Sequence, residues 1–349
     1  MHETVLAPGP AGLDLARANG KDPLFRAVRK KLFSISPAEV TTTRRRFHVD
    51  SQEKQERIEA IGSYFLKGYH AAIACDSLEQ LHQTLGNEPL EYQGFAYEGA
   101  AMGVGLLDRL MPWQNPKFPR FLESDGNPYP YLSHVGLGWA LARIPGGIRL
   151  FSRQLLTPAP IDTQASSWHS LLSCLVLDGF GFHQAFFRWE SYVRAMDQPN
   201  LHLECLKVFD QGLGRGLCFV LGMDGKRIGQ QVQQFPPSRQ ADLWSGVGLA
   251  AAYAGGLSRM EVDHLKQQAC QHLPAFAQGV AFAAKARQRA SHIPEQTQLA
   301  CACVWNQPVE QIAKITDDTL VGLHPSSKLS AYATWRERIQ QVFVSSLPT

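Results

Sequence analysis

The sequence predicts an all-α protein of about seven helical hairpins stacked in a curved or closed α/α array. Two observations lead to this prediction. From residue 58 onward apolar residues recur at helical spacing, as in Ile58, Ile61 and Phe65. In addition, glycines followed by small or apolar residues recur at an interval near 34 residues, which is the length of two helices and two turns.

Seven short segments mark this repeat, and four of them read Gly-x-Gly. They begin at Gly68, Gly99, Gly136, Gly179, Gly212, Gly246 and Gly279. The last three intervals are 33, 34 and 33 residues, and the segment that follows Trp244 is similar to the first helix of a tetratricopeptide repeat. Glycine inside a helix costs about 1 kcal/mol relative to alanine. Its recurrence at one position therefore predicts that a neighbouring helix approaches closely there.

The chain divides near residue 50. We expect a basic N-terminal arm over residues 1–50, with one short helix near residues 24–33, and a single helical repeat domain over residues 51–349. Nine basic residues fall between Arg17 and Arg46; they belong either to a solvated arm or to a surface for an anionic partner. The longest intervals hold insertions at 112–131 and 156–167, which we expect to project from one face.

Composition narrows the class of protein. Hydrophobic content of 44% and charged content of 19% are typical of a globular protein, and a net charge of +3 does not indicate a nucleic-acid partner. No apolar run approaches the roughly 18 residues of a membrane span, and the start has no secretion-signal pattern. The seven cysteines, mostly within apolar runs, are typical of reduced thiols. We expect a cytoplasmic protein.

No sequence motif predicts a cofactor or a metal. The segment Gly246-x-Gly248-x-x-Ala251 superficially fits a dinucleotide fingerprint, but a loop rather than a strand is expected before it. His264 and His272 have no third ligand nearby, and Cys301-x-Cys303 has no second pair. We therefore expect neither a metal nor a cofactor.

Polar residues lie beside the glycines of most repeats, and superposed repeats would gather them at one edge of the array. One interpretation is helix N-capping, which is common for Asp and Ser. The other is a carboxylate cluster, in which mutual repulsion raises the pKa and holds a proton near neutral pH. The candidate catalytic residues are Glu98, Asp178, His183, Asp210 and Asp242.

A second set of residues would bind the substrate. Gln211 and Arg215 are four residues apart and share a helix face, so the guanidinium could hold an anionic end of a ligand. Aromatic side chains would supply the apolar pocket around it. These are Trp139, Phe180, Phe182, Trp244 and Tyr253.

Four blocks in this order, at 97–102, 178–183, 209–215 and 242–248, resemble the UnbL-like, DUF1702 family. The resemblance covers roughly residues 25–340. It implies a cytoplasmic bacterial protein of specialised metabolism, because the family is found beside enediyne and other biosynthetic genes. It brings no assigned reaction.

Two functions of different classes follow from these residues. The first is an enzyme that cyclises or isomerises a lipophilic polyene, polyketide or isoprenoid-like substrate by proton transfer. Asp178 or Asp210 would be the acid, His183 the base or proton shuttle, and Arg215 would orient a carboxylate or phosphate end of the substrate. Neither DDxxD nor DxDD is present, so a standard terpene cyclase is excluded by motif. The second is a non-catalytic scaffold or carrier for a pathway partner or a hydrophobic intermediate.

Overall fold

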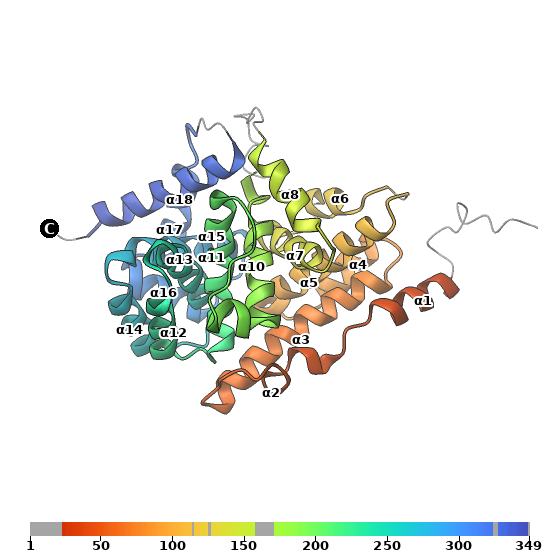
Figure 1. Cartoon of the computed structure of the whole chain (residues 1–349), viewed down its shortest axis with the longest axis horizontal. Helices are drawn as coiled ribbons and strands as arrows, with labels where there is room; N and C mark the ends of the chain where they lie inside the picture. The colour runs from red at the N-terminus through yellow and green to blue at the C-terminus, as the bar shows by residue number, and fades with distance from the viewer. Residues whose placement is uncertain (1–22, 114, 125–126, 158–170, 324–326, 348–349) are drawn as a thin grey trace, which may run out of the picture.

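The computed structural model describes residues 23–113, 115–124, 127–157, 171–323 and 327–347. Every regular element in these ranges is a helix, which confirms the predicted fold class (Figure 1). Most of the insertion predicted at 156–167 lies outside the described residues. Among the described helices, none combines the length and apolar character that a membrane span requires.

Seven inner helices carry the seven glycine segments, one in each, and each inner helix packs on the next along the chain. In Figure 1 the succession runs from the orange α3 through the green α10 and α11 to the blue α15. The inner helices are α3 (Gln52–Ala74), α5 (Leu90–Leu110), α7 (Pro130–Ala142), α10 (Leu175–Phe187), α11 (Leu203–Val220), α13 (Pro237–Tyr253) and α15 (Leu273–Arg289).

Shorter helices connect the inner ones and cover the two ends. The connecting helices are α4 (Leu78–Gly86), α6 (Phe118–Glu123), α8 (Gly147–Leu156), η3 (Glu190–Arg194), α12 (Gly225–Gln234), α14 (Arg259–Ala269), η4 (Cys270–His272), α16 (Glu295–Trp305) and α17 (Val309–Asp318). The end helices are α1 (Pro23–Phe33), η2 (Pro37–Val40), α2 (Thr42–Arg45) and α18 (Lys328–Ser345).

The glycines allow neighbouring inner helices to touch backbone to backbone, as the recurrence predicts. In each Gly-x-Gly pair the first glycine faces the preceding inner helix and the second faces the following one. A Cβ atom on Gly212 would overlap the carbonyl oxygen of Asp178 in α10, and one on Gly214 would overlap that of Leu243 in α13. Small residues at a helix crossing permit such close approach and the weak Cα–H···O contacts that accompany it.

The first inner helix meets the sixth repeat, so the curved array closes on itself. Arg57 in α3 donates to the carbonyl oxygen of Ala254 at 2.8 and 2.6 Å. Lys54 forms an ion pair with Glu261 of α14 at 2.7 Å. Ion-paired and hydrogen-bonded ends hold the first inner helix against the sixth repeat.

The segment 34–49, which we call the N-terminal cover, lies against the helical domain. Ile35 and Val40 are buried in it. The backbone N–H and hydroxyl of Thr42 donate to Glu59 at 2.9 and 2.7 Å, and the indole of Trp189 donates to the carbonyl oxygen of Arg45 at 3.0 Å. The helix expected near residues 24–33 is α1.

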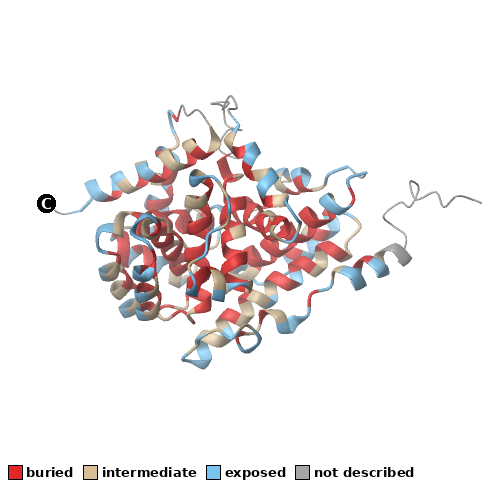
Figure 2. Cartoon of the chain, in the orientation of Figure 1, coloured by how far each residue is buried: buried red, intermediate tan, exposed pale blue. Residues whose placement is uncertain are grey.

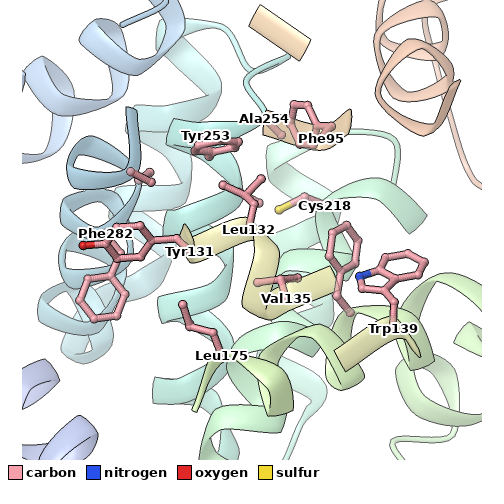
Figure 3. Packing of buried hydrophobic residues seen from close by; sticks show 14 of the residues in the cluster. Phe95, Tyr131, Leu132, Val135, Trp139, Leu175, Cys218, Tyr253, Ala254 and Phe282 are labelled. Atoms are coloured by element: carbon pink, nitrogen blue, oxygen red, sulfur yellow. The ribbon is translucent and has the colours of Figure 1, made fainter. Parts of the chain in front are cut away.

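Helix geometry decides which residues of each inner helix point to the interior. Successive residues are rotated by about 100°, so two glycines two residues apart occupy two sides of the helix. In the inner helices from α5 onward, residues four and one before the first glycine, and three and seven after it, share the remaining side, which we call the interior face; in α3 that face holds Ile58, Ile61 and Phe65 instead. In α7 these are Leu132, Val135 and Trp139, and Arg143 follows at the C-cap; Figure 3 shows the first three along one helix. The inner helices are correspondingly the most buried part of the chain (Figure 2).

A methyl group at a glycine contact tests this packing. We expect Gly212→Ala to lower the free energy of unfolding by roughly 3 kcal/mol or more, because the new Cβ meets backbone that cannot move aside. Gly86→Ala is the matched control: Gly86 ends α4 with open space around it, so alanine should be neutral or stabilise by up to about 1 kcal/mol. Urea denaturation of both variants measures the difference, and equal effects would contradict the packing.

Candidate functional site

The interior faces of five inner helices, from α3 to α11, enclose an apolar cavity of about 40 Å³, and 16 residues line it. Its charged members are Glu98 and Arg143. Trp139 lies among aromatic rings, with centroids 4.8 Å from Phe65 and 5.2 Å from Phe182. Ile35 and Val40 of the N-terminal cover also belong to the wall. A volume of this size holds a few water molecules, so a larger ligand requires the cover to move.

Glu98 is the buried acid of this cavity. Its side chain is 1% exposed, and neither carboxyl oxygen has a hydrogen-bond partner among the described residues. Burial raises the pKa of Glu98 to about 7, and the charge on Asp178 adds to the shift while Arg215 opposes it. The indole N–H of Trp139 lies beside the carboxyl and partly opposes the rise of the pKa, although the contact does not have the geometry of a full hydrogen bond and the indole has no other partner among the described residues.

A buried chain of polar residues crosses the interior, and we call it the polar ladder. It is built from the residue just before the first glycine in four consecutive inner helices. Gln211 donates to Asp178 at 2.8 Å, and Ser245 donates to Gln278 at 2.8 Å and to Gln211 at 3.4 Å. In α7 the same position is Val135, so the ladder ends at α10 and Glu98 on α5 is left without a partner.

Arg215 contacts both the polar ladder and the walls of the cavities. It forms an ion pair with Asp178, and its guanidinium lies 4.9 Å from the ring centre of Phe182. Burial disfavours the charge on Arg215, but the carboxylates of Asp178 and Glu98 outweigh this and raise its pKa. Glu98, Asp178 and Arg215, from three different helices, therefore form one electrostatic group at the centre of the array.

Helix α18 completes the ladder from outside the repeat. The hydroxyl of Tyr332 donates to Gln211 at 3.0 Å, and Arg336 donates to Gln278 at 3.1 Å and pairs with Asp242 at 2.9 Å. The sequence reasoning missed Gln278, Tyr332 and Arg336. Gln278 could have been predicted, because it precedes the first glycine of its repeat as Gln211 does. The residues of α18 belong to no repeat, so no sequence signal marks them.

A second cavity of about 30 Å³ lies on the other side of α7, between α10, α11, α13, α15 and α18. Figure 3 shows Tyr131 and Phe282 of this cavity on one side and Trp139 of the first cavity on the other, with Val135 between them. Tyr253 also lines the second cavity, and its hydroxyl has no hydrogen-bond partner among the described residues. The central charges thus separate two small apolar spaces.

Asp210 lies outside this group. It is two residues before Gly212, off the interior face, and it makes two hydrogen bonds with Arg239 at 2.9 and 2.6 Å. Burial raises the pKa of Asp210 to about 6, although Arg239 opposes the shift. Asp210 is therefore a largely ionised carboxylate held in an ion pair at neutral pH, and it lines neither cavity.

His183 lies behind the cavity wall, off the interior face. Its ring packs against Trp139 and Phe187 with centroids 5.4 and 4.8 Å away. Burial lowers the pKa of His183 to about 3, and the nearby charges of Arg143 and Arg188 contribute. The imidazole is neutral at physiological pH, and its Nδ1 atom lacks a hydrogen-bond partner among the described residues.

The remaining aromatic candidates divide between sites. Phe182 and Trp139 line the first cavity, and Tyr253 lines the second. Phe180 lines a surface hollow, and Trp244 packs on Phe276 at a centroid distance of 5.9 Å. The structure therefore does not bring all the aromatic candidates into one pocket.

The N-capping interpretation is wrong. Asp210 and Asp242 lie well inside α11 and α13, whose N-cap positions are His202 and Pro236. The glycine pairs mark helix crossings in mid-helix rather than helix starts. The segment that resembles a dinucleotide fingerprint also lies in the interior of α13. Within the described residues, no group of three His, Cys, Asp or Glu side chains could hold a metal.

The family model described as "Protein of unknown function (DUF1702)" matches residues 24–343, so the chain belongs to this family, as the sequence blocks predicted. The match covers nearly all the described helices, from α1 to α18. No curated protein and no solved structure matches the chain.

The pKa of Glu98 predicts a pH dependence of stability. Between the ordinary pKa near 4.5 and the folded value near 7, the folded state holds a proton that the unfolded state has lost, so stability falls as the pH rises. The loss amounts to about 3 kcal/mol. Glutamine at position 98 does not titrate. The free energy of unfolding of Glu98→Gln, relative to that of the wild type, should therefore rise by this amount between pH 4.5 and pH 8.

Denaturant titrations of both proteins at several pH values measure this difference. Comparison with Glu98→Gln removes the contribution of Asp210, which is present in both proteins. A difference that stays constant with pH, or that shrinks as the pH rises, would show that the pKa of Glu98 is not raised.

Proposed function

We propose that this protein is an enzyme of bacterial specialised metabolism that isomerises or cyclises a lipophilic, conjugated substrate by proton transfer, with Glu98 as the proton donor. One observation carries the proposal: a fully buried carboxyl in the wall of an aromatic cavity that makes no hydrogen bond of full geometry with any described residue. A structural carboxylate in such a place would be paired, as Asp178 and Asp210 are. Perturbed, unpaired acids concentrate at functional sites.

The pKa of Glu98, about 7, suits a group that both gives and takes a proton. The Glu98 O–H bond breaks as π electrons of the substrate form a new C–H bond, which leaves a cation delocalised over the conjugated chain. The carboxylate then removes a proton from a neighbouring carbon, and the electrons of that C–H bond form the shifted double bond. In a cyclisation, a second double bond attacks the cation before the proton is lost. No oxidant or reductant is needed.

The rest of the cavity supports these steps. The faces of aromatic rings such as Trp139, Phe182 and Phe65 would stabilise a cationic intermediate and exclude water. Once the proton has been transferred, the indole N–H of Trp139 beside the carboxyl would stabilise the carboxylate of Glu98. An acid of pKa near 7 favours an electron-rich conjugated polyene, whose protonation gives a delocalised cation, over an isolated alkene.

A second candidate function is a carrier that shields a hydrophobic intermediate or presents it to a protein partner from the same pathway. The enclosure of the cavity under Ile35 and Val40 favours this candidate, because a carrier needs the enclosure but not the acid. The two functions differ in their dependence on Glu98.

Product analysis in a host that supplies the pathway tests the proposal. We expect Glu98→Gln to lower product formation by about 100-fold or more and to accumulate a lipophilic precursor, because a general acid typically contributes factors of 10² to 10⁴. Asp210→Asn is the matched control, since it removes a buried acid that lines neither cavity. It should retain product wherever the protein remains folded.

Circular dichroism of each purified variant establishes folding. Full product formation by folded Glu98→Gln would contradict the enzyme and leave the carrier. Loss of product in both variants at equal folded concentration would contradict a special role for Glu98.

A further inference from the structure

A surface hollow of about 550 Å³ adjoins the apolar cavity. It lies between the C-terminal end of α7, the start of α8, α10 and the segment 199–201. Arg143, Arg149 and Arg188 line it, and no acidic residue does. We call it the arginine hollow.

Among the described residues, no carboxylate forms an ion pair with the arginines of the hollow, which are Arg143, Arg149 and Arg188. Arg143 and Arg188 come from different helices, yet both contribute to the lowered pKa of His183, so two like charges lie near one imidazole. Like charges without a counter-charge repel, and a bound anion would relieve that repulsion.

Neighbouring basic residues show the contrast. Arg44 pairs with Glu39 at 3.3 Å, and Arg46 pairs with Glu190 at 2.8 Å. The buried Arg239 likewise has a carboxylate partner. The charge of the arginine hollow is therefore not a general property of the basic residues in this chain.

Arg143 belongs to both spaces. It is the exposed member of the 16 residues that line the cavity, all the others being buried or partly buried, and it also lines the arginine hollow. Phe187, a partly buried neighbour in the cavity wall, directly precedes Arg188 of the hollow. The hollow and the cavity therefore adjoin at Arg143, with cationic groups on the solvent side and aromatic rings and Glu98 on the cavity side.

We propose that the ligand of this protein is an amphiphile whose phosphate or carboxylate head binds in the arginine hollow while its lipophilic chain enters the cavity. Guanidinium groups bind both kinds of head through paired hydrogen bonds. The assignment deepens the proposed function and rests on it for the role of Glu98, but binding itself requires only the hollow and the cavity. Entry of the chain displaces Ile35 and Val40 of the N-terminal cover.

Calorimetric titration of the full chain with decyl phosphate, decanoate, decanol and inorganic phosphate tests the assignment. We expect decyl phosphate or decanoate to bind at least tenfold more tightly than decanol and inorganic phosphate, because each of the latter fills one part of the site. Arg143→Gln and Arg188→Gln should each lower the affinity for the anionic amphiphile at least tenfold and change the affinity for decanol less than twofold. Arg143→Lys should restore part of the loss.

Arg259→Gln is the matched control, since Arg259 is an exposed arginine on α14, which packs on α12 and α16. It should bind as the wild type does. Glu98→Gln should bind the anionic amphiphile with the affinity of the wild type, and Arg143→Gln should lower that affinity to the same extent. Binding by this variant therefore separates a failure of the binding assignment from a failure of the proton-transfer function.

Three results would overturn the assignment. They are no binding of either anionic amphiphile to the wild type, equal affinity for inorganic phosphate and decyl phosphate, and binding that is indifferent to both Arg143 and Arg188. All the arginines substituted are exposed, so these variants are expected to fold, and circular dichroism checks this. Binding to anionic vesicles without binding to monomeric amphiphile would likewise count against the assignment.

Discussion

The backbone contact between inner helices at the glycine pairs determines most of the structure. Because Gly212 and its equivalents carry no side chain, each inner helix can lie directly on the carbonyl groups of its neighbour. That contact fixes the rotation of every inner helix about its axis. Once the rotation is fixed, one face of each helix points inward, and its composition decides what the interior contains.

The interior faces differ in polarity along the array. From α10 to α15 the position before the first glycine is polar, and the side chains satisfy one another in the polar ladder. At α7 the same position is Val135, and at α5 it is Glu98. Within the described residues, this buried acid makes no hydrogen bond of full geometry, so burial dominates its pKa. An interruption of the repeat, rather than the repeat itself, creates the candidate site.

The sequence predicted the helical array, the repeat register and the close contact at the glycines, because these depend on spacing along one chain. Of the residues that the glycine register marks, the structure brings Glu98, Asp178, Gln211 and Arg215 together in the interior. Distance along the sequence from a glycine predicted the interior residues less well than rotational position around the helix axis does. Asp210 and His183 lie near glycines but off the interior face. Helix α18 carries no repeat, so nothing in the sequence pattern indicated that Tyr332 and Arg336 would complete the ladder. Cavity volume and the closing role of the N-terminal cover depend on packing that the pattern does not encode.

The protonation of Glu98 at neutral pH is the claim on which the proposed chemistry depends most directly. Infrared spectroscopy of the carboxylic acid C=O stretch, taken as the difference between wild type and Glu98→Gln, measures it. The account predicts a protonated-carboxyl band at pH 6 that disappears with a midpoint near pH 7. A band that is already lost by pH 5 would show that Glu98 is an ordinary ionised carboxylate, and the proton-transfer function would have to be abandoned.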